Sequence, residues 1–232
     1  MIKPFKNRMQ AGVLLARRLK AYTKSADVIV LALPRGGVPL GFMVAQALDV
    51  PLDVLLVRKL GLPEHPEYAI GALASNGACL LQSDVINALG VPKETIEAIA
   101  ARERKEIERR EALYRAGRAP LQLRDKVVIL IDDGLATGST MRVALQVVRK
   151  GQPAKVIIAV PVAAPEICQE LTSLADEMIC LSTPPSFYAV GQWYEDFRQT
   201  SDEEVTSLLE KAERERLLPK QDGSPPRHPS VQ

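Results

Sequence analysis

The fold is decided by residues 127–140, which are Val127-Val128-Ile129-Leu130-Ile131-Asp132-Asp133-Gly134-Leu135-Ala136-Thr137-Gly138-Ser139-Thr140. The first five residues are aliphatic without polar alternation, which is typical of a strand buried on both faces of a parallel sheet. Two adjacent carboxylates follow at the carboxyl end of this strand, where ligands bind in open α/β sheets. A loop with two glycines then leads into a predicted helix that begins at Ser139.

The loop after the carboxylates has the chemistry of an anion site. Backbone N–H groups at a helix amino terminus, together with the hydroxyls of Thr137, Ser139 and Thr140, can donate to a phosphate dianion. Asp132 and Asp133 can accept hydrogen bonds from vicinal hydroxyls or bind a hard cation such as Mg²⁺. Both sets of groups fit a ribose 5-phosphate. An ordinary strand-turn-helix with acidic turn residues is the alternative, but it leaves the Thr-Gly-Ser-Thr sequence unexplained.

This segment resembles the motif with which type I phosphoribosyltransferases bind 5-phosphoribosyl-1-pyrophosphate (PRPP). The resemblance implies that Asp132 and Asp133 bind the ribose hydroxyls and Mg²⁺, and that the following loop binds the 5′-phosphate. The implied PRPP-binding residues of that loop are Gly134, Ala136, Thr137, Gly138, Ser139 and Thr140. Other phosphate motifs fit less well, because the loop lacks the Gly-Lys-Ser/Thr ending of a P-loop and no GxGxxG follows the first strand.

A second loop, Leu33-Pro34-Arg35-Gly36-Gly37-Val38, also follows a predicted buried strand. Arg35 offers a bidentate cation, and the two glycines allow backbone amides to approach a polyanion closely. The loop resembles the pyrophosphate-binding loop of the same family, which implies that Arg35, Gly36 and Gly37 bind PRPP and that the Pro34–Arg35 peptide is cis. A glycine-rich turn with a solvated arginine is the alternative.

Two further segments resemble parts of this family. The first, Val57 to Pro63, contains Arg58-Lys59 and resembles the adenine and orotate branches; this implies that Lys59 contacts pyrophosphate and that the loop through His65 closes over the site. A surface turn is the alternative. The second, Pro185 to Gly191, resembles the hood of hypoxanthine enzymes and implies that Phe187 stacks on the base. Aromatic packing of the hood is equally compatible with that segment.

Ala136 departs from one branch of the family. Enzymes for 6-oxopurines carry an aspartate at this position of the motif, where it exchanges a proton with the purine. Alanine resembles the adenine enzymes instead, so hypoxanthine and guanine are disfavoured as acceptors.

The whole pattern predicts an α/β protein with the type I phosphoribosyltransferase fold: a central, mainly parallel sheet flanked by helices, a small hood near residues 183–200 and an inserted charged helix near residues 93–118. The domain covers residues 1–218, and the polar, proline-rich tail 219–232 is expected to be disordered. The other elements expected are strands at 28–33, 52–57, 156–160 and 178–181, a hairpin at 69–81, and helices at 8–22, 38–48, 139–150, 165–174 and 201–218.

Composition narrows the class of protein. The 232 residues carry a formal charge of +2 with acids and bases interspersed, which argues against a nucleic-acid surface. Three separated cysteines indicate free thiols, and the only histidines, His65 and His228, argue against a histidine metal cluster or a catalytic triad. Charged residues recur from Met1 to Lys20, and no apolar run reaches the ~18 residues of a membrane span. We therefore expect a cytoplasmic protein.

The function expected is transfer of the phosphoribosyl group from PRPP to a small heterocyclic base, with Mg²⁺, in nucleotide metabolism. Asp132, Asp133, Arg35 and Lys59 are the expected catalytic residues, and we expect a homodimer. The main alternative is a non-catalytic PRPP sensor, although the 27 residues before Val28 are fewer than the ~60 of an added DNA-binding domain. A hydrolase or lyase for a phosphorylated sugar would use the same anion site.

Overall fold

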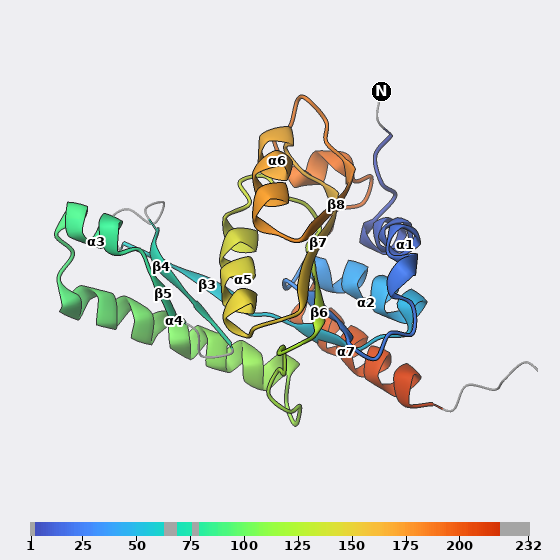
Figure 1. Ribbon diagram of the computed structural model, residues 1–232, viewed down its shortest axis with the longest axis horizontal. Helices are drawn as coiled ribbons and strands as arrows, with labels where there is room; N and C mark the ends of the chain where they lie inside the picture. The colour runs from blue at the N-terminus through green and yellow to red at the C-terminus, as the bar shows by residue number, and fades with distance from the viewer. Residues whose placement is uncertain (1–2, 63–68, 76–78, 219–232) are drawn as a thin grey trace, which may run out of the picture.

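Five parallel strands form a central sheet in the order β2-β1-β6-β7-β8 (Figure 1). The computed structural model describes residues 3–62, 69–75 and 79–218. The strands of the central sheet are β1 (Val28–Ala32), β2 (Leu52–Val54), β6 (Val127–Ile131), β7 (Lys155–Val162) and β8 (Glu177–Ser182). Its flanking helices are α1 (Arg8–Arg18), α2 (Gly37–Leu48), α5 (Ser139–Lys150), α6 (Pro165–Leu174) and α7 (Asp202–Leu217). The expected parallel sheet with helices on both faces is confirmed.

The central sheet separates two apolar cores. Alternate residues of β6 enter each core: Ile129 and Ile131 pack with residues of α1, α2 and α7, whereas Val128 and Leu130 pack with residues of α5 and α6. Figure 1 shows these two groups of helices on opposite sides of the sheet. Burial on both faces explains why β6 shows no polar alternation.

Side-chain caps fix the starts of two helices. Asn7 caps α1 by accepting a hydrogen bond from the Gln10 N–H at 2.9 Å, and Ser201 caps α7 by accepting one from the Glu204 N–H at 3.1 Å. Each cap satisfies an N–H that has no partner inside the helix. The start of α7 therefore agrees with the helix expected from residue 201.

The prediction of one strand over residues 52–57 is wrong. β2 ends at Val54, and a separate strand, β3 (Val57–Gly61), belongs to another sheet. The change occurs at two adjacent residues, because the Leu55 N–H donates to the Ala32 carbonyl of the central sheet at 3.1 Å and the Leu56 carbonyl accepts from the Ser75 N–H at 3.0 Å. Both residues are apolar and buried, so no turn residue marks the break.

The second sheet is antiparallel and consists of β3, β4 (Ala69–Ala74) and β5 (Cys79–Leu81). The hairpin expected at 69–81 is confirmed in its strands, while its turn, 76–78, lies outside the described residues. Two helices follow, α3 (Ser83–Leu89), which was not predicted, and the charged helix α4 (Lys93–Tyr114), which ends four residues before the expected Arg118. We call these strands and helices the arm, which projects away from the central sheet in Figure 1.

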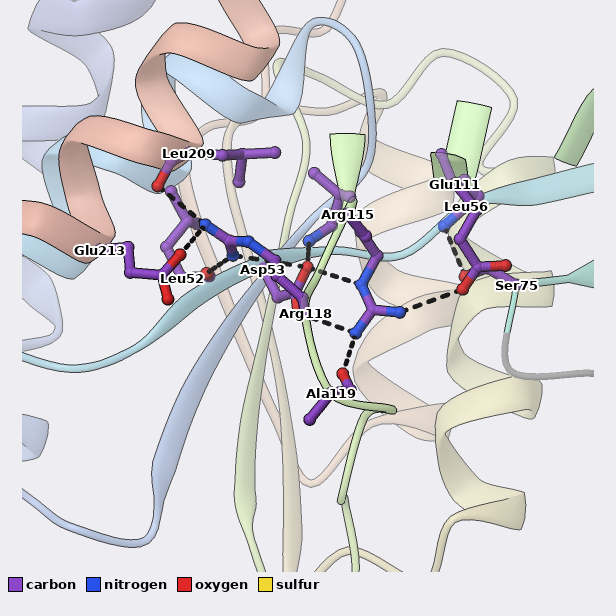
Figure 2. Close-up of polar contacts among 11 residues, drawn as sticks. Leu52, Asp53, Leu56, Ser75, Glu111, Arg115, Arg118, Ala119, Leu209 and Glu213 are labelled. Atoms are coloured by element: carbon purple, nitrogen blue, oxygen red, sulfur yellow. Dashed lines mark hydrogen bonds and ion pairs between the residues drawn. The ribbon is translucent and has the colours of Figure 1, made fainter. Parts of the chain in front are cut away.

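A buried ionic network ties the arm to the central sheet (Figure 2). Arg115, just after α4, donates through Nε and Nη2 to the two carboxylate oxygens of Asp53 on β2 at 3.0 and 3.1 Å. Arg118 donates to the Leu52 carbonyl at 3.0 Å and to the Leu209 carbonyl on α7 at 2.9 Å. Since the Arg115 and Asp53 side chains are only 5% and 12% exposed, this pair is an interior contact.

Three sequence-based expectations concern the chain as a whole. The cysteines are free, as expected. Within the part of the chain that the structure describes, no helix has the length and apolar character needed to cross a membrane. The tail expected to be disordered, 219–232, lies outside the described residues.

Candidate functional site

The carboxyl ends of β1 and β6 bring two loops into contact. Ala32 pairs with Ile131 in parallel register, so the β1–α2 loop (residues 33–36) and the β6–α5 loop (residues 132–138) leave the sheet side by side. A Cβ on Gly36 would lie 2.1 Å from Asp133 Oδ2. Only glycine permits this approach, which explains its position next to the acid pair.

The Pro34–Arg35 peptide is cis, as predicted from the resemblance of this loop to the pyrophosphate-binding loop. The Arg35 side chain is 31% exposed and extends towards the first turn of α7, where Nη1 lies 3.5 Å from Asp202 Oδ1. Asp202 also accepts a hydrogen bond from the Tyr114 hydroxyl, and burial with this bond raises the pKa of Tyr114 to about 12. Arg35 thus belongs to the β1–α2 loop, but its side chain has a carboxylate partner on α7.

The β6–α5 loop has the form expected of a phosphate cradle. Leu135 is joined to the end of β7, because its N–H donates to the Val162 carbonyl at 3.0 Å. Gly138 then adopts a positive φ of 66°, a conformation that costs other residues about 1–2 kcal/mol, and α5 starts at the next residue. The Thr137 and Ser139 hydroxyl oxygens lie 3.0 Å apart, and Thr137 is exposed together with Ala136.

Arg142 on α5 holds this loop through a hydrogen bond to its main chain. Arg142 Nη1 donates to the Thr137 carbonyl at 2.7 Å, and its Nη2 is held by Glu170 of α6 at 2.6 Å. Arg142 thus holds the Thr137 carbonyl, two residues before the amino terminus of α5, and helix amino termini bind anions.

The two carboxylates lie in different surroundings. Asp132 Oδ1 accepts from the Asp133 N–H at 2.9 Å, and burial together with the Asp133 charge raises the pKa of Asp132. Asp133 Oδ2 accepts a hydrogen bond from Nε of Arg8, the first residue of α1, at 2.8 Å and forms an ion pair with Nη2 of the same residue at 2.7 Å. Burial raises the pKa of Asp133, and the Arg8 charge acts in the opposite direction.

Arg8 was missed by the sequence analysis. It stands 125 residues from Asp133 and has the sequence context of any arginine on an amphipathic helix. One general signal was available: a buried carboxylate pair requires a cation or a proton. That rule calls for a partner but does not select Arg8 from the arginines of the chain.

The hood, residues 183–200, is irregular apart from the 3₁₀ helix η2 (Val190–Trp193). Phe187 is partly buried, and its ring is stacked on Trp193 with centroids 6.3 Å apart and planes at 25°. The hood contacts the β6–α5 loop at two points: Val190 packs on Gly134, and the Tyr194 hydroxyl donates to the Asp133 carbonyl at 2.6 Å. These contacts agree with the predicted position of the hood next to the site.

The third predicted segment lies on the arm. Lys59 is exposed on β3, and no hydrogen bond or ion pair joins its side chain to another described residue. Arg58 is paired with the buried Glu103 of α4, with Nε and Nη2 each 2.8 Å from Oε2. A small cavity of about 20 Å³, bordered by Arg58, Arg110, Pro34 and Thr140, marks where the arm meets the two loops. His65 lies outside the described residues.

The acid pair suits a metal ion that the substrate helps to bind. In the described part of the chain, no three His, Cys, Asp or Glu side chains form a metal-binding group. Mg²⁺ usually takes one or two carboxylates and completes its shell with water and substrate phosphates. Asp132 and Asp133 fit that limited contribution.

The comparisons with known proteins define the class. The chain belongs to the phosphoribosyl transferase domain family, whose family model matches residues 6–197. It is 43% identical, over 214 residues, to proteins of Mycobacterium tuberculosis strains CDC 1551 and H37Rv that are named as phosphoribosyl transferases. The match covers 92% of this chain and 48% of each relative, so the chain spans about half the length of these relatives.

A solved structure supports the fold. The crystal structure of TT1426 from Thermus thermophilus superposes with a TM-score of 0.80 at 40% sequence identity, covering 90% of this chain and 98% of that chain. The type I phosphoribosyltransferase fold expected from the sequence is confirmed by the five-stranded parallel sheet and this match.

Proposed function

We propose that the protein is a Mg²⁺-dependent phosphoribosyltransferase that binds PRPP, transfers its 5-phosphoribosyl group to a nitrogenous base and releases pyrophosphate. One observation carries the proposal: the β1–α2 loop and the β6–α5 loop touch at the acid pair, with Gly36 against Asp133. A phosphate cradle, two carboxylates and a glycine-rich cationic loop are thereby brought together at the carboxyl ends of β1 and β6. These are the groups needed for the phosphate, the diol and the pyrophosphate of a single PRPP molecule.

Each part of the donor has a partner of matching chemistry. The 5′-phosphate would accept hydrogen bonds from the N–H groups at the start of α5 and from the hydroxyls of Thr137, Ser139 and Thr140. Hydrogen bonds to charged groups contribute about 1.5–3 kcal/mol each, so several of them give a firm anchor. The ribose hydroxyls would donate to the acid pair, and the pyrophosphate would lie against Gly36, Gly37 and Arg35.

The reaction needs no side-chain nucleophile. The acceptor nitrogen forms a bond to C1 of the ribose while the bond from C1 to the pyrophosphate oxygen breaks, and pyrophosphate leaves with the electron pair. Protein groups act by holding the two reactants in line and by stabilising charge on the leaving group. Mg²⁺, when bound with PRPP at the acid pair, would supply further neutralisation of the pyrophosphate charge.

The acceptor would bind under the hood. Phe187 presents an aromatic surface suited to stacking on a planar heterocycle. Its ring is held by the stack with Trp193, and the hood is fixed to the acid pair through Tyr194. These contacts support an acceptor site next to C1, with Phe187 as its stacking residue.

The test is pyrophosphate release from PRPP and Mg²⁺ in the presence of single purines and pyrimidines. Release that depends on both the acceptor and the protein, together with formation of the matching nucleotide, would support the transferase. Calorimetric binding of PRPP without turnover of any acceptor would contradict it and favour a PRPP sensor. Acceptor-independent release of pyrophosphate would instead indicate a hydrolase.

A further inference from the structure

The acid pair is not symmetric, and the difference comes from Arg8. Arg8 is the first residue of α1, and its Nε and Nη2 atoms lie 2.8 and 2.7 Å from the same oxygen of Asp133, Oδ2. The two side chains are only 11% and 15% exposed. Hydrogen bonds between a guanidinium and a carboxylate are among the strongest in proteins, and burial protects them from screening by salt.

Asp133 is enclosed from two further directions. Gly36 leaves just enough room for its Oδ2, since a Cβ there would lie 2.1 Å away. Its main-chain carbonyl accepts from the Tyr194 hydroxyl at 2.6 Å. Asp133 therefore connects α1, the β1–α2 loop and the hood from within.

Asp132 has a different set of partners. Its Oδ1 atom accepts from the Asp133 N–H at 2.9 Å. Among residues 3–62, 69–75 and 79–218, no N–H or O–H group donates to Oδ2 of Asp132. Oδ1 of Asp133 has no donor among these residues either, so the two carboxylates differ in one respect: Arg8 forms an ion pair with Asp133 and none with Asp132.

Arg8 also binds the hood directly. Its Nη1 atom donates to the Arg198 carbonyl at 2.6 Å, and its guanidinium carbon lies 4.0 Å from the centroid of the Phe197 ring. The chain just before Arg8 pairs with the hood as well: the Phe5 N–H donates to the Trp193 carbonyl and the Glu195 N–H donates to the Phe5 carbonyl, both at 2.8 Å. The amino-terminal segment and the hood form one unit around Arg8.

We propose that Arg8 is a positioning residue that neutralises Asp133 and holds it in place, so that Asp132 carries the uncompensated charge that meets the ligand. Asp133 then fixes the β1–α2 loop and the hood relative to the site. The identity of the ligand as Mg²⁺ and PRPP rests on the proposed function, whereas the Arg8–Asp133 pair does not. This division of roles replaces the equal roles that the sequence motif implies for the two acids.

The test is a double-mutant cycle on the full chain with Arg8→Gln, Asp133→Asn and the combined variant. Two quantities are measured for each: the thermal unfolding midpoint without ligand, and the Kd for PRPP at several Mg²⁺ concentrations. Each single change is expected to lower the midpoint, and the double variant should fall little further, because contacting residues have non-additive effects. Arg17→Gln, at an exposed position of α1, is the matched control and should leave both quantities unchanged.

The binding measurement distinguishes the two acids. Asp132→Asn should raise the Kd about 100-fold, the equivalent of roughly two charge-assisted hydrogen bonds at the lower end of their range, and increase the Mg²⁺ requirement. Asp133→Asn should raise the Kd no more than Arg8→Gln does, about tenfold or less, with the Mg²⁺ requirement unchanged. Arg8→Lys, which keeps the charge but loses the planar fork, should recover part of both effects.

Two results would overturn the proposal. The first is additive loss of thermal stability in the cycle, which would mean that Arg8 and Asp133 act independently. The second is an Asp133→Asn variant that loses PRPP and Mg²⁺ as strongly as Asp132→Asn. Should the wild type bind no PRPP, the proposed function fails, and the stability cycle still decides for or against the role of Arg8.

Discussion

The central sheet and the arm share apolar packing but differ in their use of buried charge. Strands of the central sheet are apolar on both faces, and their ends carry the acid pair and both loops of the site. The arm is a small antiparallel sheet whose edge strand β5 is partly exposed, covered on one side by a highly charged helix. Apolar packing fixes the site and also joins the arm, since Leu60, Ile70 and Ile107 belong to the core of the central sheet; at the arm a buried ionic network is added.

The charged contacts of the arm differ greatly in burial. On α4, Glu106 accepts hydrogen bonds from Arg109 and Arg110, which lower the pKa of Glu106 to about 2. Exposed pairs of this kind contribute little to stability, typically about 0–1 kcal/mol. The pair of Arg115 with Asp53 is buried, and breaking a buried pair leaves an uncompensated charge. The attachment of the arm should therefore depend on this pair far more than on the surface pairs.

The largest effect is expected for Arg115→Ala. Loss of one partner from a buried ion pair costs about 3–5 kcal/mol. Buried Asp53 would keep only its longer contact with Arg118, whose Nη1 lies 3.8 Å from Oδ1, so we expect the lower end of that range. Urea unfolding should show this decrease in the free energy of unfolding, whereas Arg104→Ala on the exposed side of α4 should change it by less than about 0.5 kcal/mol. Equal effects of the two changes would show that the network in Figure 2 does not hold the arm.

The second-largest effect is expected for ligand binding at the acid pair. Changing both Asp132 and Asp133 to Asn keeps the shape of the side chains and removes the charge that faces the diol. PRPP binding in the presence of Mg²⁺ should weaken by at least about 100-fold, because each charge-assisted hydrogen bond lost is worth about 1.5–3 kcal/mol. Lys105→Gln, on the exposed face of α4, is the control from the arm. Unchanged PRPP affinity in the double variant by calorimetry would remove the basis of the proposed function.

A smaller and more selective effect is expected for Arg35. If Arg35 binds the leaving group, Arg35→Ala should weaken pyrophosphate binding by about 10-fold or more, the loss of one charged hydrogen bond, with little effect on ribose 5-phosphate. Lys59→Ala should act in the same direction but more weakly, since Lys59 is exposed on the arm. Equal losses for both ligands would assign Arg35 a structural role through its contact with Asp202.

The comparison of the two regions also explains what the sequence could predict. Both site loops were predictable because each has a local pattern in the sequence: an apolar strand, then acids or glycines, then the start of a helix. The cis peptide at Pro34–Arg35 followed from the resemblance of that loop to its family. The break after Val54 was not predictable, because it depends on which distant strand offers the next hydrogen bond, Ala32 or Ser75.

Long-range contacts between charged groups are the other feature that the sequence hides. Arg8 has no local mark that separates it from Arg17 or Arg18 on the same helix, yet it alone of these three reaches the acid pair. The charged helix posed the same difficulty, because its many charged residues give no sign that Ile99, Glu103 and two further residues of α4, Ile107 and Tyr114, are buried.

The smallest effect is expected at Ala136, and it concerns the acceptor. Ala136 is exposed on the β6–α5 loop and offers no proton acceptor to a ring nitrogen. A positioned general base contributes typically about 10²–10⁴-fold to a rate, so the wild type should turn over adenine or a smaller heterocycle faster than hypoxanthine or guanine. Ala136→Asp would introduce the carboxylate into a site not built around it. We therefore expect at most about a tenfold rise in 6-oxopurine turnover, well below the full contribution of such a base.

The measurement is steady-state turnover of hypoxanthine, guanine, adenine and orotate by the wild type and by Ala136→Asp. Thr137→Ser is a matched control in the same loop, because it keeps the hydroxyl and adds no carboxylate; its acceptor preference should equal that of the wild type. The rise should appear in kcat for 6-oxopurines and leave the KM for PRPP within about twofold, since a general base acts in the transition state. Wild-type turnover of hypoxanthine or guanine well above that of adenine would contradict this interpretation of Ala136. The acceptor would then have to be selected elsewhere, with the hood around Phe187 as the next region to change.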